Sequence, residues 1–465
     1  MTVPSEIPRT PPEAWPPLMR AARVMAKPLA RFLGIQASSA VLLAVATAVA
    51  LAWANSPWAS SYESLLQMTV GVSFRGAHVE RSLQWIVNDV LMVVFFFVVG
   101  MEIRREVHEG ELSTPRRAAL PVAAALGGML APAAVYVGLA TQPGAREGWG
   151  VPMATDIAFA VGVFAALGKR VPAALRVLLL AVAVIDDLGA ILVIAVFYTG
   201  GIAWSALAGA ALGVAAIYAM QALGVRSRLA YVAPGLVVWA GLYGAGIHPT
   251  LAGVIVGFAT PVRQWVGPEG FAARIHEEHE ALSGDPVDRR ELLASLERVE
   301  LARREALSPS ESLIEALHPW VAYAIMPLFA FANAGVSLRG VSLGGAEREV
   351  ALAITAGLLI GKPLGVLLTS ALAIRLKLAT LPIGLTRRHL VVLGVVAGIG
   401  FTMSLFIAQL AFRDPSLLLA AKVGVLGASA AAVALGLTLG RALLSPEVTP
   451  GAAEDVDDAE RSTER

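Results

Sequence analysis

The sequence predicts an all-α polytopic membrane protein with twelve transmembrane helices and one small β-hairpin. Of its 465 residues, 57% are hydrophobic and only 15% are charged, whereas a soluble domain averages about a quarter charged. The mean hydropathy is +0.69. A chain this apolar could not cover its surface with polar groups in water, which excludes a soluble enzyme, a disordered protein and a nucleic-acid binder. With no cysteine, the chain has neither disulfides nor thiolate metal sites.

Apolar stretches recur along most of the chain, and a stretch of roughly 17 to 25 residues is long enough to cross a bilayer. They lie at residues 36–54, 85–105, 118–140, 150–168, 174–198, 203–222, 229–244, 247–261, 318–336, 350–374, 390–412 and 416–440. The seventh and eighth are separated by Gly244, Gly246 and the pair His248-Pro249, which interrupt a helix. They are therefore counted as two spans.

Basic residues orient the chain, because short cytoplasmic loops carry an excess of Lys and Arg. With twelve spans and a cytoplasmic N-terminus, 28 of the 36 basic residues lie inside, 6 lie outside, and Lys362 and Lys422 lie within spans. Both termini are therefore expected in the cytoplasm. The sequence predicts a disordered tail at 1–35, a transmembrane domain at 36–441 and a second disordered tail at 442–465.

Two segments between spans have their own patterns. Residues 67–75 alternate polar and apolar side chains with a period of two, which predicts an external β-hairpin between the first two spans. Residues 262–317 are rich in Glu and Arg with Leu and Ala at helical spacing, which predicts cytosolic amphipathic helices.

Four charged residues are predicted to lie deep in the membrane, where a charge is costly and usually functional. Asp186 and Asp187 lie about 18 Å from either end of the fifth span, and Lys362 is equally central in the tenth. Adjacent residues of a helix point about 100° apart, so the two aspartates can line one cavity and meet different partners. A buried ammonium needs a carboxylate, and this pair lies at the matching depth.

The fourth charge is Asp156, which follows Thr155 in the fourth span. Gly150 and Pro152 precede them and predict a break in this helix. Residues 398–402 (GIGFT) predict a similar break in the eleventh span. The two breaks occupy corresponding places if spans 3–5 and 10–12 are repeats. Structural roles remain open, since Thr155 and Asp156 could cap a half-helix and Lys362 could be a structural ion-pair partner.

Several motifs together resemble the NhaA family of sodium/proton antiporters. The resemblance rests on 154–160 (ATDIAFA), 184–189 (VIDDLG), 361–365 (GKPLG) and 398–404 (GIGFTMS), and is extended by 88–89 (ND), 99–102 (VGME), 248–253 (HPTLAG), 318–320 (HPW) and 333–335 (NAG). It covers nearly everything from residue 36 to 441. NhaA is itself one of the transporters for which inverted repeats and broken helices at the binding site are described.

The resemblance implies a secondary transporter, not an enzyme. It would exchange cytoplasmic Na⁺ or Li⁺ for external protons without a cofactor, in the inner membrane of a prokaryote. Asp187 would be the main Na⁺ ligand, and Asp186 a proton carrier and second Na⁺ ligand that pairs with Lys362 when Na⁺ is absent. Thr155 and Asp156 would lie where the two broken spans cross.

The resemblance also implies residues that respond to pH and a pairing of protomers. Glu102, Arg105, Glu106 and His248 would respond to pH, although an ordinary solvated interface would look the same around Glu102. Two family residues before His318 are replaced by Ile314 and Glu315, which is a departure from the family's pattern at a position implicated in the pH response. The hairpin near 65–80 would join two protomers into a homodimer surrounded by membrane lipid.

Other functions are compatible with parts of the pattern. A sodium-coupled symporter for an organic acid is the main alternative, on a related inverted-repeat fold. An intramembrane aspartyl protease needs aspartates on separate helices, typically in a Gly-x-Gly-Asp motif, which does not occur here. A passive cation channel is disfavoured by the buried Lys362. For Asp89, near the start of the second span, a helix-capping role is favoured.

Overall fold

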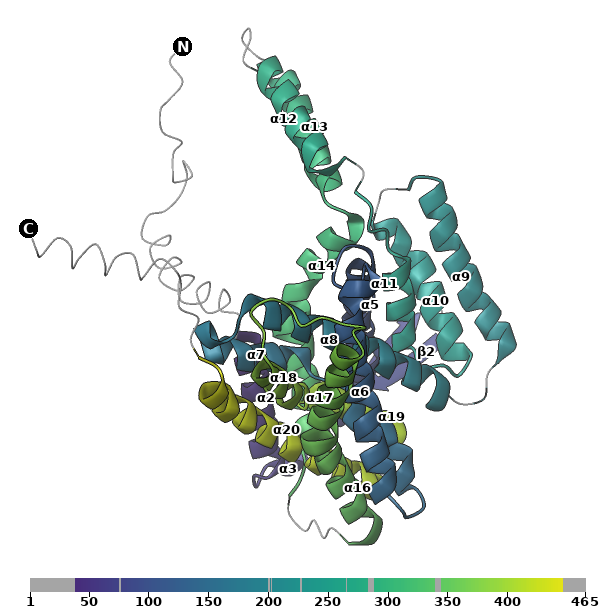
Figure 1. Ribbon diagram of the computed structural model, residues 1–465. Helices are drawn as coiled ribbons and strands as arrows, with labels where there is room; N and C mark the ends of the chain where they lie inside the picture. Colours follow the sequence, from purple (N-terminus) through teal and green to yellow (C-terminus); the bar gives the residue numbers. More distant parts are fainter. Residues whose placement is uncertain are drawn as a thin grey trace, which may run out of the picture.

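The computed structural model describes residues 38–445, except 75–76, 200, 202, 226–227, 265, 283–287 and 339–343. The predicted tail at 1–35, and that at 442–465 beyond residue 445, lie outside the described residues. The described chain is almost entirely helical (Figure 1).

The first half of the chain contains α2 (Ser38–Ala54), α3 (Ala59–Gln67), β1 (Thr69–Phe74), β2 (Ala77–Ser82), α4 (Leu83–Trp85), η1 (Ile86–Leu91), α5 (Met92–His108), α6 (Pro115–Leu139), η2 (Ala145–Met153), α7 (Ile157–Leu167), η3 (Gly168–Arg170), α8 (Ala173–Phe197) and α9 (Trp204–Ala222). The second half contains η4 (Arg228–Tyr231), α10 (Val232–Gly244), α11 (Thr250–Ala259), α12 (Gly267–Leu282), α13 (Arg289–Ala306), α14 (Pro309–Trp320), η5 (Val321–Ile325), α15 (Met326–Ala334), α16 (Gly345–Ala356), η6 (Gly357–Gly361), α17 (Lys362–Arg375), α18 (Arg387–Ala397), α19 (Phe401–Ala411) and α20 (Pro415–Leu443).

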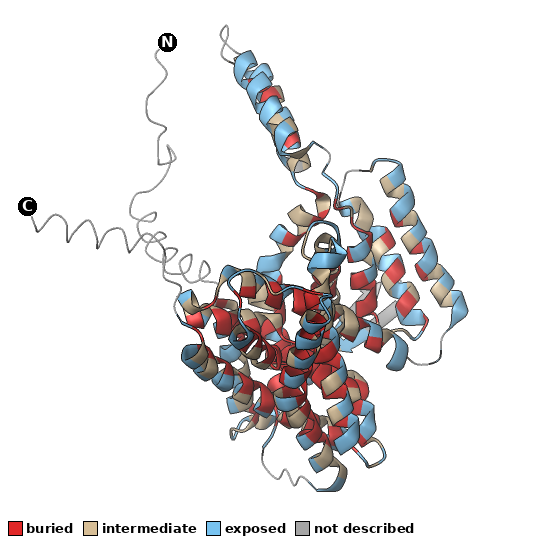
Figure 2. Ribbon diagram, in the orientation of Figure 1, coloured by how far each residue is buried: buried red, intermediate tan, exposed pale blue. Residues whose placement is uncertain are grey.

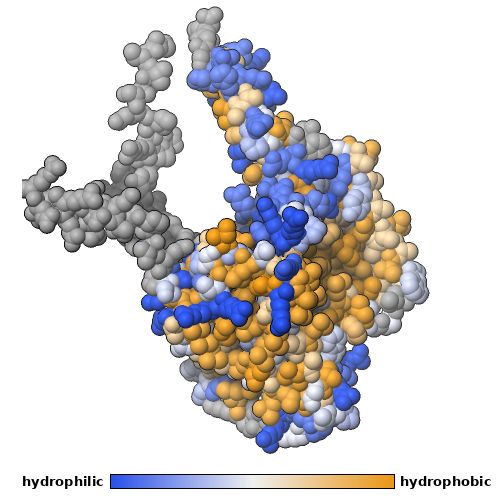
Figure 3. All heavy atoms as spheres, in the orientation of Figure 1, coloured by the Kyte–Doolittle hydropathy of each residue, from blue (hydrophilic) through white to orange (hydrophobic). Residues whose placement is uncertain are grey.

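Within the described residues, seven helices are long and apolar enough to cross a membrane, or up to ten if each sharply bent pair is one span. Helices α10 and α11 are apolar but have only 13 and 10 residues. Every predicted apolar stretch contains a helix, so the all-helical class is confirmed, and length and composition support seven to ten crossings. Figure 3 shows a broad hydrophobic surface on the helical body, with hydrophilic residues gathered toward its two ends.

The predicted β-hairpin is present as a two-stranded antiparallel sheet. Strand β1 pairs with β2 in a register that runs from Thr69 opposite Ser82 to Phe74 opposite Ala77. The sequence did not predict α3, which lies between the first apolar helix and the hairpin and is bent by 116° from α2. Ser82, at the end of β2, caps the following helix by accepting a hydrogen bond from the Trp85 amide.

Three helices contain a turn of π-helix, which no periodicity in the sequence indicates. These turns are η1, η5 and η6. Two of them stand just before a proline, Pro327 after η5 and Pro363 after η6. Proline lacks a backbone N–H and crowds the carbonyl four residues earlier, so a wider turn accommodates it. The π-turn η6 ends at Gly361 and positions Lys362 at the start of α17.

The transmembrane helices pack in two groups. The first helix group contains α2, α3, α5, α9, α10, α11, α14 and α15; the second contains α6, α7, α8 and α16 to α20. Glycines bring backbones together within each group, as is common in membranes. A Cβ added at Gly365 of α17 would lie 2.0 Å from the carbonyl oxygen of Gly127 in α6, and one at Gly253 of α11 would lie 2.2 Å from that of Val93 in α5.

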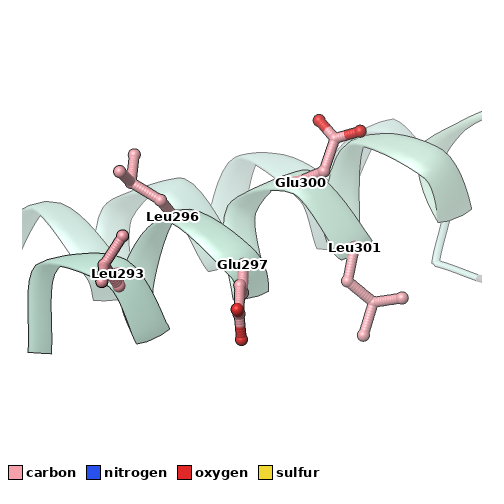
Figure 4. Close-up of a pocket in the computed structure, with 5 residues that line it drawn as sticks. All are labelled: Leu293, Leu296, Glu297, Glu300 and Leu301. Carbon is pink, nitrogen blue, oxygen red and sulfur yellow. The ribbon is translucent and has the colours of Figure 1, made fainter. Parts of the chain in front are cut away.

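Helices α12 and α13 form a hairpin that projects from the helical body (Figure 1) and is exposed along most of its length (Figure 2). The Arg298 guanidinium contacts the Glu278 carboxylate at 2.5 and 2.8 Å. These hydrogen bonds lower the pKa of Glu278 to about 2. A pocket on α13 is lined by Leu293, Leu296, Glu297, Glu300 and Leu301 (Figure 4).

Candidate ion-binding site

Two broken helices cross at the centre of the second helix group, where buried residues gather (Figure 2). The pair η2 and α7 is bent by 43°, and the pair α18 and α19 by 45°. The breaks touch through backbone atoms, because the amide of Asp156 donates to the carbonyl of Ile399 at 2.7 Å. Glycine also lets this crossing pack closely against η6, since a Cβ at Gly398 would lie 2.5 Å from the carbonyl oxygen of Leu358. The predicted breaks in both helices are present.

Asp156 caps both half-helices that begin at the crossing. Its side chain is 1% exposed. One carboxylate oxygen accepts from the Phe159 amide at 3.0 Å, and the other accepts from the Thr402 amide at 3.1 Å and from the Thr402 hydroxyl. A carboxylate satisfies the free N–H groups at a helix N-terminus and matches the positive end of its dipole. The capping role considered for Asp156 is therefore present, and it serves α7 and α19 together.

Asp186 lies in the middle of α8, the helix of the fifth apolar stretch, and makes an ion pair and a hydrogen bond there. It is fully buried, and its Oδ2 atom lies 2.8 Å from the Lys362 ammonium. The Thr155 hydroxyl lies 2.7 Å from the same oxygen and 3.0 Å from the carbonyl of Ala397, two acceptors for a single proton. Lys362 also donates to the carbonyl of Met153. The predicted pairing of Lys362 with a carboxylate of this helix is present.

Asp187 follows Asp186 in the chain but is not part of its ion pair with Lys362. Its side chain is 1% exposed, and its Oδ1 atom has no hydrogen-bond partner among the described residues. A buried carboxylate oxygen without a partner is costly. The arrangement therefore favours binding of a small cation or a proton at Asp187.

The site is not a preformed cage for a resident metal ion. In the described part of the chain, no three His, Cys, Asp or Glu side chains are arranged to hold one. The polar groups around the ion pair of Asp186 and Lys362 are the Thr155 hydroxyl and the backbone carbonyls of Met153 and Ala397 at the helix breaks.

The four residues expected to respond to pH lie at two places. Glu102, Arg105 and Glu106 are near the end of α5, and the Glu106 carboxylate accepts from the Glu111 amide at 2.7 Å. His248 lies 3.8 Å from Asp89, and thirteen residues of helix, about 20 Å, separate Asp89 from Glu102.

Asp89 lies inside η1, so the capping role favoured for it is wrong. Ser82 caps this helix instead.

Sequence reasoning did not single out Thr402 or Ser404. Thr402 shares the Asp156 carboxylate, and the Ser404 hydroxyl donates to the carbonyl of Val151 at 2.8 Å. Both residues follow the Gly-Ile-Gly break, and the only signal was that two small hydroxyl side chains lie within four positions of Gly400. Which carbonyl or carboxylate they meet depends on how the two broken helices cross.

Comparison with known proteins identifies the family of this chain. The sequence profile of the family described as Na⁺/H⁺ antiporter 1 matches residues 30–439. The chain belongs to this antiporter family. It is therefore a membrane-embedded, multi-pass protein, and the family is one of secondary transporters rather than enzymes.

Relatives within the antiporter family match over nearly their whole length. The chain is 62% identical to a Na⁺/H⁺ antiporter NhaA 2 of Myxococcus xanthus, over 97% of each chain. It is 53% identical to an NhaA 2 of Sorangium cellulosum over 99% of each chain. It is 49% identical to an NhaA 2 of Pseudomonas putida, over 89% of this chain and 92% of the relative. The family resemblance inferred from the motifs is confirmed.

Proposed function

We propose that this protein is a secondary transporter that exchanges Na⁺ for H⁺ through the site at Asp186 and Asp187. The observation that carries this proposal is the buried, unpartnered carboxylate oxygen of Asp187 beside the ion pair of Asp186 and Lys362. The names of its relatives support exchange and give no support to the sodium-coupled symporter of an organic acid. The exchange needs no cofactor, because the ions themselves are the substrates.

Competition for the same carboxylates couples the two ions. Moving uncompensated carboxylates through a low-dielectric barrier is costly, so the site crosses easily only when Na⁺ or protons occupy it. One Na⁺ adds a single positive charge and two protons add two, so the two loaded states differ by one charge. When Na⁺ binds, Lys362 releases Asp186, which serves as a second ligand. Li⁺, a smaller cation of the same charge, is expected to use the same oxygens.

Thr155 and Asp156 are proposed to keep the site in shape while it changes its charge. Asp156 neutralises the positive ends of α7 and α19, so that these dipoles do not attract an anion into the cation site. The Thr155 hydroxyl can turn from Asp186 to the carbonyl of Ala397 without moving the backbone. It can therefore follow the loss or gain of charge on Asp186.

The finer topology remains a proposal. Seven to ten crossings together with the short helices α10 and α11 are compatible with twelve spans. With twelve spans, the distribution of basic residues puts both termini in the cytoplasm and the hairpin of β1 and β2 outside, in a prokaryotic inner membrane. The similar bends of 43° and 45° in the two broken helices favour inverted repeats made from spans 3–5 and 10–12.

We also propose that Glu102, Arg105, Glu106 and His248 adjust transport to pH, and that the protein forms a homodimer through its β-hairpin. A two-stranded sheet leaves free edges that can pair with another copy. The mass of the solubilised protein, with and without residues 69–82, tests the dimer.

Exchange is expected to be electrogenic. If two protons enter for each Na⁺ that leaves, every cycle moves one net charge, so a membrane potential can drive Na⁺ transport. In proteoliposomes containing the full chain, an imposed pH gradient is expected to drive Na⁺ uptake, and an imposed potential of the right sign to accelerate it. Flux that ignores the potential would contradict the electrogenic stoichiometry. Na⁺ flux that ignores the pH gradient would contradict exchange itself.

A further inference from the structure

Three amide side chains connect the two helix groups in a closed ring of hydrogen bonds. Asn88 in η1 and Asn333 in α15 belong to the first helix group, and Gln409 in α19 belongs to the second. The Asn333 amide donates to Asn88 at 2.7 Å, and the Asn88 amide donates to Gln409 at 2.9 Å. The Gln409 amide donates back to the side-chain oxygen of Asn333. The ring thus spans the boundary between the groups.

The ring is buried enough for its hydrogen bonds to matter. Asn333 is fully buried, and its amide also donates to the carbonyl of Phe329 at 2.9 Å. Asn88 and Gln409 are half-buried. An amide deprived of its partner in such surroundings bears the cost of desolvation. The ring therefore specifies one relative position of the two groups.

The position of Gln409 links the ring to the ion site. Gln409 lies seven residues beyond Thr402 in the same helix, about 10 Å along its axis. Thus α19 contacts the Asp156 carboxylate at its first turn and the first helix group at its last. Other hydrogen-bonded side chains, such as Tyr62 with Phe331 and Thr141 with Glu349, join residues of the same group. The ring instead opposes sliding of α19 against η1 and α15.

We propose that Asn88, Asn333 and Gln409 form an amide latch that holds the two helix groups in the conformation of the structure and opens in each transport cycle. The latch rests on the proposed exchange function, because a transporter must expose its site to each side of the membrane in turn. Packed helix groups make such changes by sliding or rotating as units. Hydrogen bonds across the boundary favour one end state over the other, and breaking them shifts the population.

The test compares Gln409→Met, which removes the amide but keeps a chain of similar length, with Gln221→Met. Gln221 is a matched control, since its amide donates to the carbonyl of Ala259 within the first helix group. The natural chain has no cysteine, so Ser64→Cys and Arg413→Cys supply one spin-label site on each group. Both positions are exposed. Pulsed electron paramagnetic resonance then measures the distance between the groups in lipid, without any need for transport.

Gln409→Met is expected to raise the ratio of the alternative distance to the parent distance about tenfold, because both hydrogen bonds of the Gln409 side chain across the boundary are lost. Gln221→Met is expected to leave the distribution unchanged. An unaltered distribution in Gln409→Met, or an equal shift in both variants, would overturn the latch. A shift confined to Gln409→Met in a protein that shows no Na⁺/H⁺ exchange would overturn the proposed function and leave the latch standing.

A second variant keeps the test decisive if Gln409→Met does not fold. Asn88→Leu, at a half-buried member of the ring, removes the hydrogen bond that the Asn88 amide donates to Gln409 across the boundary and leaves Gln409 itself unchanged. The same pair of spin labels is expected to show the alternative distance more often than in the parent. An unaltered distribution in Asn88→Leu would overturn the latch.

Discussion

Replacing Asp187 with asparagine is expected to abolish Na⁺/H⁺ exchange while leaving the protein inserted and folded. Asparagine keeps the size of the side chain and one carbonyl oxygen, but it cannot balance the charge of Na⁺. Losing one partner of a buried charge pair costs about 3 kcal/mol or more, which corresponds to a fall in exchange rate of at least about 100-fold. Dissipation of a pH gradient by added Na⁺ in everted vesicles measures this rate.

The matched control is Asp414→Asn at the surface. Asp414 caps α20 by accepting a hydrogen bond from the Ser416 amide at 2.8 Å, and these hydrogen bonds lower its pKa. Its replacement is expected to leave the exchange rate within about twofold of the parent, because exposed contacts away from the site contribute little. Exchange at the parent rate by the Asp187 variant would remove this carboxylate from the transport site.

Replacing Lys362 with methionine is expected to produce the largest loss of stability. It leaves the Asp186 carboxylate buried without its ion-pair partner, 2.8 Å away in the parent. Removing one member of a buried pair lowers the free energy of unfolding by about 3 to 5 kcal/mol. The double variant Lys362→Met/Asp186→Asn is expected to recover most of that loss, because no uncompensated charge remains. Thermal unfolding in one detergent at one pH measures all the variants.

Lys422→Met is the matched control for the lysine. Lys422 also lies within an apolar helix, α20, but the described part of the structure shows no ion pair for it. Its replacement is expected to change the free energy of unfolding by less than about 1 kcal/mol. A double variant less stable than Lys362→Met alone would show that the two charges do not depend on each other.

The sequence predicts the structure best for charged residues whose contacts are set by their depth in the membrane. Asp186 and Lys362 are both central in long apolar helices, so their pairing followed from position and charge alone. The breaks at residues 154–156 and 398–400 followed from glycine and proline. By contrast, the sharing of Asp156 by α7 and α19 depends on the crossing of two helices nearly 250 residues apart, as in the hydrogen bond to Thr402.

Other features escaped prediction for local reasons. The π-turns add one residue to a helical turn without changing its apolar character, so periodicity does not reveal them. Asp89 is an acceptable capping residue by type, but the chain begins its helix earlier, at Ser82. The amide ring joins Asn88, Asn333 and Gln409 from three separate apolar helices. Asn88 and Asn333 lie in motifs that resemble the family, but nothing in those motifs indicates that the two side chains meet Gln409. Such clusters become visible only when the helices are packed.

The central claim is that Na⁺ and protons compete for the carboxylates of Asp186 and Asp187. Calorimetric titration of the purified full chain with NaCl, in two buffers of different ionisation enthalpy at one pH, counts the protons released for each Na⁺ bound. The account predicts release of protons on binding, between one and two per Na⁺ at a pH where the site is largely protonated, and no measurable binding by Asp187→Asn. Na⁺ binding to the parent protein at that pH without proton release would contradict it.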